Sequence, residues 1–535
     1  MHKDCRYSEQ AFFKIGYKNM IGIILENTTK KSLYVFKTLF GIMGFEYYFI
    51  SGKDAESYPV VVYYGNNFNL KPKYAIEIPV SDDFIKKIGK DPFTKSNGKA
   101  IFNIDLVSLS FFLLSRQEEM DNKARDMHKR FDHSETILKD FIKEPIISNY
   151  IRHLEKLIIE GFRKQNLPLL KKAYWPCGED FAASLTHDVD VLYKYNFIGS
   201  LVQAKKILAL FLKLKFRLAL SSAWTMVRCI ITNEKPYWQM LNVADFEKKY
   251  GLRSSFYLCA KRRHKLDPYY DVRSNEIKNA IRKLHSMGFE IGVHGSYTSY
   301  LDFKKLSEEK EILEKALNGK VTGNRQHFGR FEAPYTWRLH NRLFVYDSTI
   351  GYINMSGFRA SICFPFNAYD ALEDRELDLI EAPFTTSDGT LFGPMNLSKE
   401  DAWKDTEKLI DTIRENNGLI VLDWHQRVIY EKDYPGYWWV YTKAVERIKE
   451  LKAYVAPLGE IIKWWMSRGN LIVKFNKKGK SCEISSKKEV KNASFLLYNA
   501  NKFKIEGNGK YDLIKKNGCF LIKFEMLKDA VIKIN

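Results

Sequence analysis

Between residues 181 and 466 the sequence alternates short apolar strands with amphipathic helices, and this alternation constrains the fold more than any other feature. Strand patterns such as FAASLT and FEIGVH stand beside helix patterns such as EIKNAIRKLHSMG, which ends in glycine. Further along, the helix pattern KDTEKLIDTIRENNG precedes the strand LIVLDWH. Repeated strand–helix units of this length predict an α/β region with a parallel sheet, either doubly wound or closed into a barrel.

Two regions with different patterns flank this alternation. Residues 1–170 contain short strands such as VVVYY and a helical stretch, LVSLSFFLLSRQEE, which predict a separate α+β domain of unknown role. Residues 470–535 alternate apolar and polar positions between Gly, Asn and Lys turns, as a small all-β module does. The sequence therefore predicts three domains, 1–170, 181–466 and 470–535.

Polar residues that can bind a metal or move a proton follow the strands of the central region. The strand ends read HDVD (187–190), VHGSY (293–297), RQHFGR (325–330) and DWHQ (423–426). Sites in parallel α/β folds lie at the carboxyl ends of the strands, so we expect these segments to form one site. A single DxD is also typical of a turn that caps the next helix. Four polar strand ends together favour a site.

The HDVD segment indicates which side chains face the site. In an extended strand, Asp188 and Asp190 point to one face and His187 points to the other. Two carboxylates this close repel each other unless a cation lies beside them. Zn²⁺ takes His nitrogen and Asp oxygen, and a catalytic site keeps one position open for water. We therefore expect Asp190 and His294 to be metal ligands.

Some side chains at these strand ends would not bind the metal, and we expect two of them to transfer protons. Asp188 could accept a proton from water, and His425, from the opposite side of the pocket, could protonate a leaving group. Arg330 could hold a carboxylate by a bidentate contact. Together these residues predict metal-assisted hydrolysis in which the base and the acid are separate side chains.

At these residues the chain resembles the polysaccharide deacetylases of carbohydrate esterase family 4, in the bacterial subgroup with an extra N-terminal domain. The family's motifs correspond, in the family's order, to SLTHDVD, EIGVHGSY, RFEAPYTW and IVLDWHQ, and the resemblance covers about 181–466. It implies a distorted, incomplete (β/α) barrel and a divalent metal, usually zinc. It also implies a hydrolase that removes N-acetyl groups from amino sugars in a surface polysaccharide or its precursor.

The resemblance also assigns roles by position. Asp188 matches the base, Asp190 and His294 match metal ligands, and His425 matches the general acid. The remaining third-motif matches are Arg330 and Pro334.

One position departs from the family's pattern. Thr298 stands where the family usually has a second histidine ligand, and a hydroxyl is a poor substitute for imidazole on zinc. Three outcomes are open: His327 supplies the missing nitrogen, His187 turns inward, or the metal is weak or absent. Strand alternation disfavours His187, and it places Arg330 opposite His327 if that segment is extended. We take His327 as the expected third ligand.

Aromatic residues beside the motifs indicate a glycan site. Tyr335, Trp337 and Trp424 lie next to the strand ends, where aromatic faces could stack on sugar rings. The expected partner is thus an N-acetylated glycan or glycolipid. The alternative hypothesis, prompted by Thr298, is a barrel that has lost catalysis and binds glycan or acts as a membrane-peripheral scaffold.

A basic amphipathic segment, 204–231, interrupts the strand–helix pattern. It could lie on an anionic membrane surface. More often such a segment covers a sheet with its apolar face, and this interpretation is the one we favour.

Charge and cysteine content narrow the functional classes. Lys and Arg exceed Asp and Glu by 85 − 64 = 21, which suits nucleic acid, anionic lipid or acidic glycan. No nucleic-acid-binding motif accompanies this charge, so we expect no nucleic-acid partner. The seven cysteines are widely spaced without a CxxC pair, and the first 20 residues lack a signal-peptide pattern. We expect a cytoplasmic protein, with membrane association if 204–231 binds lipid.

Overall fold

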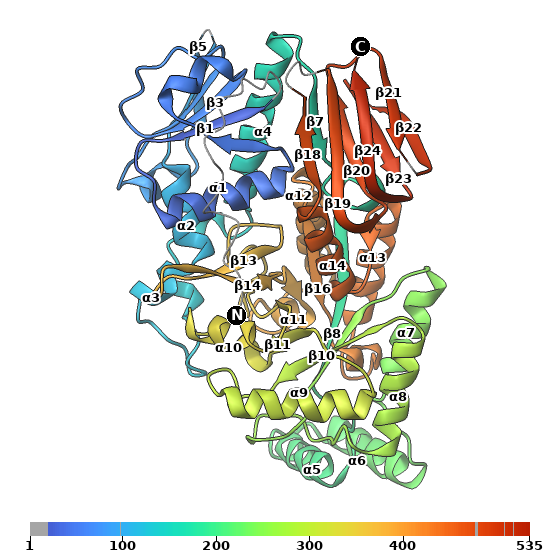
Figure 1. Ribbon diagram of the computed structural model, residues 1–535. Coiled ribbons are helices and arrows are strands. Elements are labelled where there is room, and N and C mark those ends of the chain that lie inside the picture. Colours follow the sequence, from blue (N-terminus) through green and yellow to red (C-terminus); the bar gives the residue numbers. More distant parts are fainter. Residues whose placement is uncertain (1–19, 97, 477–479, 508, 517, 535) are drawn as a thin grey trace. The chain divides into compact units, whose positions relative to one another are not determined.

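The computed structural model describes residues 20–534 except 97, 477–479, 508 and 517, and the chain forms two compact units (Figure 1). The central unit contains Leu114–Pro145 and Phe181–Ile462. The terminal unit contains the residues up to Leu113, then Ile146–Asp180, and the residues from Lys463 on. Each unit is therefore assembled from segments that are far apart in the sequence.

A ten-stranded, largely parallel sheet forms the core of the central unit. Its order is β13-β14-β12-β11-β10-β9-β8-β16-β15, with β17 also paired to β8, and only β13 runs antiparallel to its neighbour. No pairing among the described strands joins β13 to β15, so the sheet is open. The expected α/β class is confirmed. The strands are β8 (Ala182–Val189), β9 (Ser255–Leu258), β10 (Glu290–Gly295), β11 (Gly323–Gln326), β12 (Tyr346–Asp347), β13 (Phe366–Asp370), β14 (Arg375–Glu381), β15 (Thr386–Ser387), β16 (Leu419–Asp423) and β17 (Tyr454–Val455).

Amphipathic helices connect these strands, and helix α8 shows why they form. The Ser274 side chain accepts a hydrogen bond from the Ile277 backbone nitrogen at the N-cap, and Ile277, Ile281 and Leu284 are buried along one face. The helices of the central unit are α3 (Gln117–Asp121), α5 (Phe197–Leu212), α6 (Phe216–Ile231), α7 (Met240–Lys249), α8 (Asn275–Ser286), α9 (Phe303–Leu317), α10 (Tyr335–Asn341), α11 (Asp388–Phe392), α12 (Lys399–Glu415) and α13 (Tyr437–Glu450).

The strand register brings the polar strand ends together. In β8, Thr186 pairs with Asp423 of β16 on one side, and Asp188 pairs with Tyr257 of β9 on the other. Further along the sheet, His294 of β10 lies opposite Arg325 of β11. Parallel strands end at the same edge of a sheet. The four motifs therefore converge at one edge.

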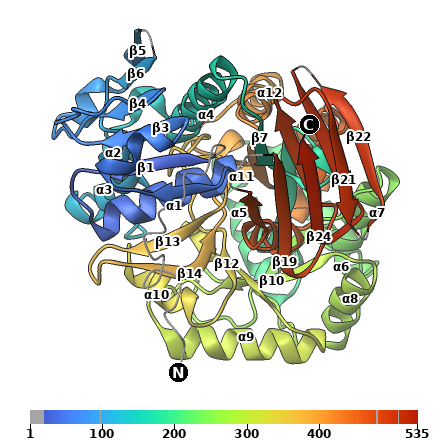
Figure 2. The same ribbon diagram turned by 45° about the horizontal axis from the view of Figure 1, so that its top comes forward.

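The terminal unit contains a six-stranded sheet and two four-stranded sheets, and Figure 2 shows the four-stranded sheets in a view tilted by 45° from that of Figure 1. The six-stranded sheet has the order β2-β1-β3-β4-β6-β5, and the smaller sheets have the orders β18-β19-β24-β21 and β22-β23-β20-β7. The strands are β1 (Ile21–Leu25), β2 (Tyr47–Phe49), β3 (Val60–Tyr64), β4 (Ala75–Ile78), β5 (Phe93–Ser96), β6 (Lys99–Phe102), β7 (Leu169–Lys172), β18 (Ile472–Phe475), β19 (Ser481–Lys491), β20 (Ser494–Tyr498), β21 (Phe503–Gly507), β22 (Tyr511–Lys516), β23 (Cys519–Phe524) and β24 (Met526–Ile534). The accompanying helices are α1 (Lys30–Met43), α2 (Leu106–Leu114), α4 (Ile146–Lys164) and α14 (Leu458–Gly469), of which α2 and α14 run across unit boundaries.

The C-terminal strands do not stand apart as the expected separate module. Strand β7, which lies in the sequence between the two segments of the central unit, pairs antiparallel with β20. One apolar cluster also joins Val61 and Tyr63 of β3 to Phe495 and Ile522 of the C-terminal sheets. The physical reason is burial, because the module covers its apolar face with strands from the N-terminal region. The compact units thus differ from the expected domains 1–170, 181–466 and 470–535.

The segment 114–145 belongs to the central unit because a buried ion pair holds it there. Glu119 contacts Arg359 through both carboxylate oxygens, each at 2.8 Å, and Arg116 at 2.7 Å. All three side chains are almost fully buried. Burial alone would raise the pKa of Glu119, but the charges of Arg359 and Arg116 outweigh it and lower that pKa to about 2.

Replacing Glu119 with Gln should destabilise the central unit, because it removes the carboxylate that both buried guanidinium groups contact and leaves Arg116 the more distant Glu118, at 3.8 Å. We expect the free energy of unfolding to fall by about 3–5 kcal/mol in urea titrations. Glu135→Gln, an exposed change on the same segment, should alter it by less than about 0.5 kcal/mol. Because the folded-state pKa lies below the ordinary value of 4.5, this stabilisation is complete above pH 4.5 and is lost as pH falls toward 2. A difference between wild type and Glu119→Gln that grows on acidification would contradict this assignment.

Candidate metal and hydrolytic site

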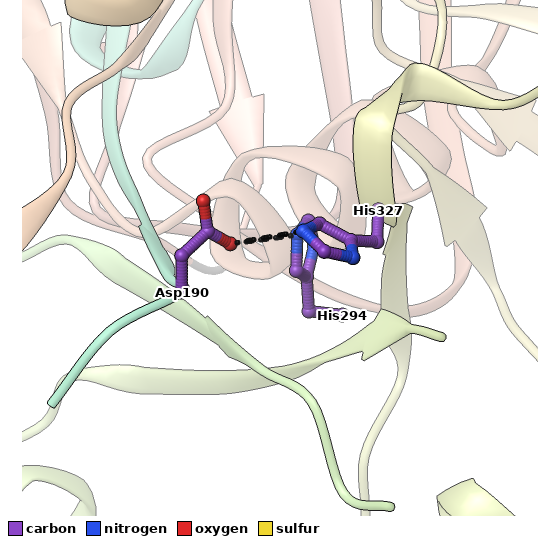
Figure 3. A group of neighbouring side chains, drawn as sticks. All are labelled: Asp190, His294 and His327. Atoms are coloured by element: carbon purple, nitrogen blue, oxygen red, sulfur yellow. Dashed lines mark ion pairs between the residues drawn. The ribbon is translucent and has the colours of Figure 1, made fainter. Parts of the chain in front are cut away.

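Three potential metal ligands meet at the edge of the central sheet (Figure 3). Asp190 directly follows β8, His294 lies near the end of β10, and His327 begins the turn after β11. Asp190 Oδ1 lies 3.4 Å from His294 Nε2 and 3.5 Å from His327 Nε2. The three ligand atoms all lie within 4.8 Å of one another, a separation that one ion could bridge.

The other ring nitrogens of these histidines are already engaged. His294 Nδ1 donates to the Arg325 carbonyl at 2.9 Å, and His327 Nδ1 faces Asp267 Oδ1 at 3.4 Å. Both Nε2 lone pairs are therefore directed at Asp190. Among the described residues nothing hydrogen-bonds to the buried Asp190 Oδ1. A buried carboxylate oxygen without a donor is costly, and a cation held with the two imidazoles would compensate it, so these residues fit a divalent metal such as zinc.

The structure distinguishes between the two candidate histidines for the third position. His187 is fully buried on the opposite face of β8, where its Nε2 lies 2.9 Å from Glu247 Oε1 and its Nδ1 contacts the Trp424 carbonyl at 2.6 Å. His327 reaches the site because the chain does not stay extended after β11. It turns at 327–329, where Phe328 has a φ of 61°. This turn brings His327 Nε2 to the cluster with Asp190 and His294.

Arg325, and not Arg330, contacts the carboxylates of Asp188 and Asp423. Arg325 Nη1 lies 3.2 Å from Asp188 Oδ1 and 3.1 Å from Asp423 Oδ1. Arg330 instead donates to the backbone carbonyl oxygens of His128 and Tyr297. The expected carboxylate contact of Arg330 was therefore wrong, because the turn at 327–329 rotates the chain after β11.

Asp423 and Asp188 share the positive charge of Arg325. Asp423 is buried, and burial together with the nearby Asp188 raises its pKa to about 7, even though Arg325 acts in the opposite direction. Asp188 is placed with its second oxygen, Oδ2, 3.8 Å from His294 Nδ1. Asp188 thus lies beside the ligand cluster without belonging to it.

His425 lies between two carboxylates. Its Nδ1 lies 2.7 Å from Asp388 Oδ1, and its Nε2 lies 3.0 Å from Asp190 Oδ2. Burial alone would lower the pKa of His425, but Asp388 and Asp190 outweigh it and raise that pKa well above its ordinary value. Arg427 also faces Asp190 Oδ2, at 3.5 Å. His425 is therefore fixed next to the ligand cluster by contacts from both ring nitrogens to carboxylates.

Two of the three expected sugar-binding aromatics cannot contact a ligand. Trp337 and Trp424 are fully buried, and their indole nitrogens donate to Glu381 Oε2 and to the Tyr437 carbonyl. These two predictions were wrong, because both side chains serve the core of the central unit. Tyr335 is exposed, as a sugar-stacking residue must be.

Sequence reasoning missed three residues that complete the site. Arg325 lies in the same strand end as His327, but the sequence pattern indicated Arg330 for the carboxylate contact instead. Asp388, in SDGTL, has the pattern of a turn and helix cap, which concealed its contact with His425. Asp267 lies in a loop with no motif, and only the folded chain brings it to His327.

Comparisons with known proteins match one family model and several solved structures, each over part of the chain. Residues 21–163 match the model of a family of unknown function, DUF7033. A structure assigned as a polysaccharide deacetylase from Mycobacterium smegmatis aligns with 56% of this chain and 94% of its own, at 18% identity and a TM-score of 0.36. The PuuE allantoinase aligns with 55% and 92%, at 13% identity and a TM-score of 0.38. A carbohydrate esterase family 4 pseudoenzyme from Bacillus anthracis aligns with 55% and 68%, at 11% identity and a TM-score of 0.28.

No curated protein matches the sequence. The structural similarities include hydrolases and a pseudoenzyme, at identities below 20% and TM-scores below 0.4. They assign neither an activity nor a substrate to this chain. The geometry of the site is the basis for its function.

Replacing a ligand should remove the metal without unfolding the protein. We expect Asp190→Ala, His294→Ala and His327→Ala each to lower zinc affinity by at least tenfold, measured by competition with a chromogenic chelator, because each removes one of three donor atoms. His285→Ala, on the exposed side of α8, should leave the affinity unchanged. Wild-type affinity in His294→Ala would refute this ligand set.

Asp267 should act through His327 and not as a ligand. Asp267→Asn removes the carboxylate that orients the His327 ring, and we expect zinc affinity to fall 10- to 100-fold. In the His327→Ala background the same change should have little further effect, because the two residues act as one unit. Additive losses in that double variant would show that Asp267 contributes independently.

Proposed function

We propose that the protein is a metal-dependent hydrolase that removes N-acetyl groups from amino sugars in a bacterial surface polysaccharide or its precursor. The observation that carries this proposal is the position of Asp190. One of its oxygens faces His294 and His327, and the other contacts His425. Amide hydrolysis by a metal site needs a cation that polarises the carbonyl and a nearby proton donor. The ligand cluster and His425, which pairs with Asp388 and Asp190, stand in this arrangement.

Each site residue has a defined part in this reaction. Asp190, His294 and His327 would hold a divalent cation, which would supply Lewis-acid polarisation of the amide carbonyl. Asp188 accepts a proton from the attacking water, and Arg325 holds its carboxylate in position.

The leaving amine needs a proton as the C–N bond breaks. His425 lies at the ligand cluster and donates this proton to the amine nitrogen, so acetate and a free amine result. Asp388 fixes the orientation of the imidazole through Nδ1 and stabilises its charged form.

The order of the four sequence motifs supports an N-acetylated amino sugar as the substrate, carried on a glycan or a glycolipid. The donor set of two imidazoles and one carboxylate supports zinc as the metal. A cytoplasmic location is part of the same proposal.

A second candidate is a glycan-binding protein that has lost catalysis. Thr298 favours it, because the ligand cluster depends on a histidine from another strand end. In that case the cluster would bind metal without supporting hydrolysis.

Removing the base or the acid separates these two candidates. We expect Asp188→Asn and His425→Gln each to reduce acetate release from N-acetylated oligosaccharides by about a hundredfold or more, since each removes one proton-transfer group. Zinc content should stay at the wild-type level, and Asp378→Asn, on an exposed position of β14, should retain full activity. Wild-type protein loaded with zinc that releases no acetate from any amino-sugar substrate would support the binding role instead.

A further inference from the structure

Helices α5 and α6 form a hairpin that packs on itself and leaves most of its apolar surface exposed. Figure 1 shows both helices at the lower end of the central unit, and α5 contacts α6 along its length. The only buried residue of α5 is Gly199, and those of α6 are Ala219, Thr225 and Cys229. The favoured expectation that residues 204–231 cover a sheet was therefore wrong, because their apolar side chains do not reach one.

The exposed apolar residues of the hairpin form a stripe on each helix. Thirteen of the twenty-nine exposed large hydrophobic residues in the described chain lie within 197–231. Residues spaced by four, seven and eleven positions share one side of an α-helix. On α5 the stripe consists of Phe197, Leu201, Leu208 and Leu212, and on α6 it consists of Phe216, Leu220, Trp224, Val227 and Ile231.

Most of the surface of several of these side chains is exposed to solvent. Phe197 is 81% exposed, Leu212 76%, Trp224 70% and Ile231 77%. Contiguous apolar surface of this kind on a folded protein marks an interaction site. The hairpin is therefore a docking surface that is uncovered in the single chain.

The charge of the hairpin indicates what it binds. Residues 197–231 contain six basic side chains and no Asp or Glu. Five of these, Lys205, Lys206, Lys213, Lys215 and Arg217, form no ion pair with any described residue, while Arg228 pairs with Glu234 at 2.7 Å. Apolar stripes whose charged neighbours within the hairpin are all basic match an anionic bilayer surface. Protein interfaces, in contrast, are depleted of Lys.

The hairpin is attached at the end of the sheet that carries the candidate site. Its N-cap, Asn196, follows Asp190 by a short loop and donates to the Tyr269 carbonyl at 3.1 Å. On the other helix, Thr225 contacts Lys432, which lies in the loop after His425. Docking through the hairpin would thus place the strand ends near the docked surface.

We propose that the α5–α6 hairpin binds the surface of anionic lipid bilayers, with its apolar stripes in the interface and its basic residues at the lipid phosphates. No described helix is long and apolar enough to cross a membrane, so the hairpin would lie on the bilayer. Combined with the proposed function, this geometry makes a lipid-carried glycan the substrate class that reaches the site. The docking itself does not depend on catalysis.

Vesicle binding tests the docking with the full-length protein. We expect sedimentation with phosphatidylcholine vesicles containing about one third phosphatidylglycerol, and release as salt rises from about 0.1 to 0.5 M. Lys205→Gln combined with Lys206→Gln should lower the partition coefficient roughly thirtyfold. The matched pair Lys487→Gln and Lys488→Gln, on exposed positions of β19, should not change it.

A second pair of variants tests the apolar stripes. Leu212→Ser with Trp224→Ser should lower the partition coefficient roughly tenfold or more, because both side chains leave the interface. Leu372→Ser, at another exposed apolar position, should leave it unchanged.

No binding to anionic vesicles, or equal binding to pure phosphatidylcholine, would overturn the proposal. Concentration-dependent dimers that Leu212→Ser with Trp224→Ser abolish would also overturn it and assign the surface to a second copy. These measurements need no hydrolysis, so a failure here is distinct from a failure of the proposed reaction.

Discussion

The carboxylate of Asp190 connects the two halves of the candidate site. Its Oδ1 faces the Nε2 atoms of His294 and His327, and its Oδ2 contacts His425. A carboxylate offers two oxygens in a fixed geometry, so one side chain can hold a cation and a proton donor at a set separation. The remaining residues of the site support this arrangement. Asp267 orients His327, and the Arg325 carbonyl accepts from His294.

The charge balance of this edge is consistent with a bound cation. Four carboxylates, those of Asp188, Asp190, Asp388 and Asp423, lie together in a buried region with the guanidinium groups of Arg325 and Arg427. Burial, together with the nearby Asp188, raises the pKa of Asp423 to about 7, although Arg325 acts in the opposite direction. A divalent cation at Asp190 would add positive charge to this group of carboxylates.

Two features of the central unit serve different purposes. Its buried Glu119–Arg359 pair ties the segment 114–145 to the unit and concerns stability. The strand-end loops hold the site, and the α5–α6 hairpin extends from these same loops. Binding surfaces commonly occupy the loops at strand ends because a rigid sheet positions them.

The amino-acid sequence by itself determined the α/β class of the central region, the four polar strand ends, and the face of β8 that carries Asp188 and Asp190. These features follow from local periodicity, since side chains alternate along a strand and parallel strands end at one edge. It also disfavoured His187, and the structure places this residue on the opposite face with Glu247. Tertiary structure decided the rest. The turn at 327–329 gave the carboxylate contact to Arg325 and not Arg330, and long-range packing brought Asp388 to His425. Burial of Trp337 and Trp424, exposure of the hairpin and the pairing of β7 with β20 depend on contacts between distant segments, which local sequence patterns do not encode.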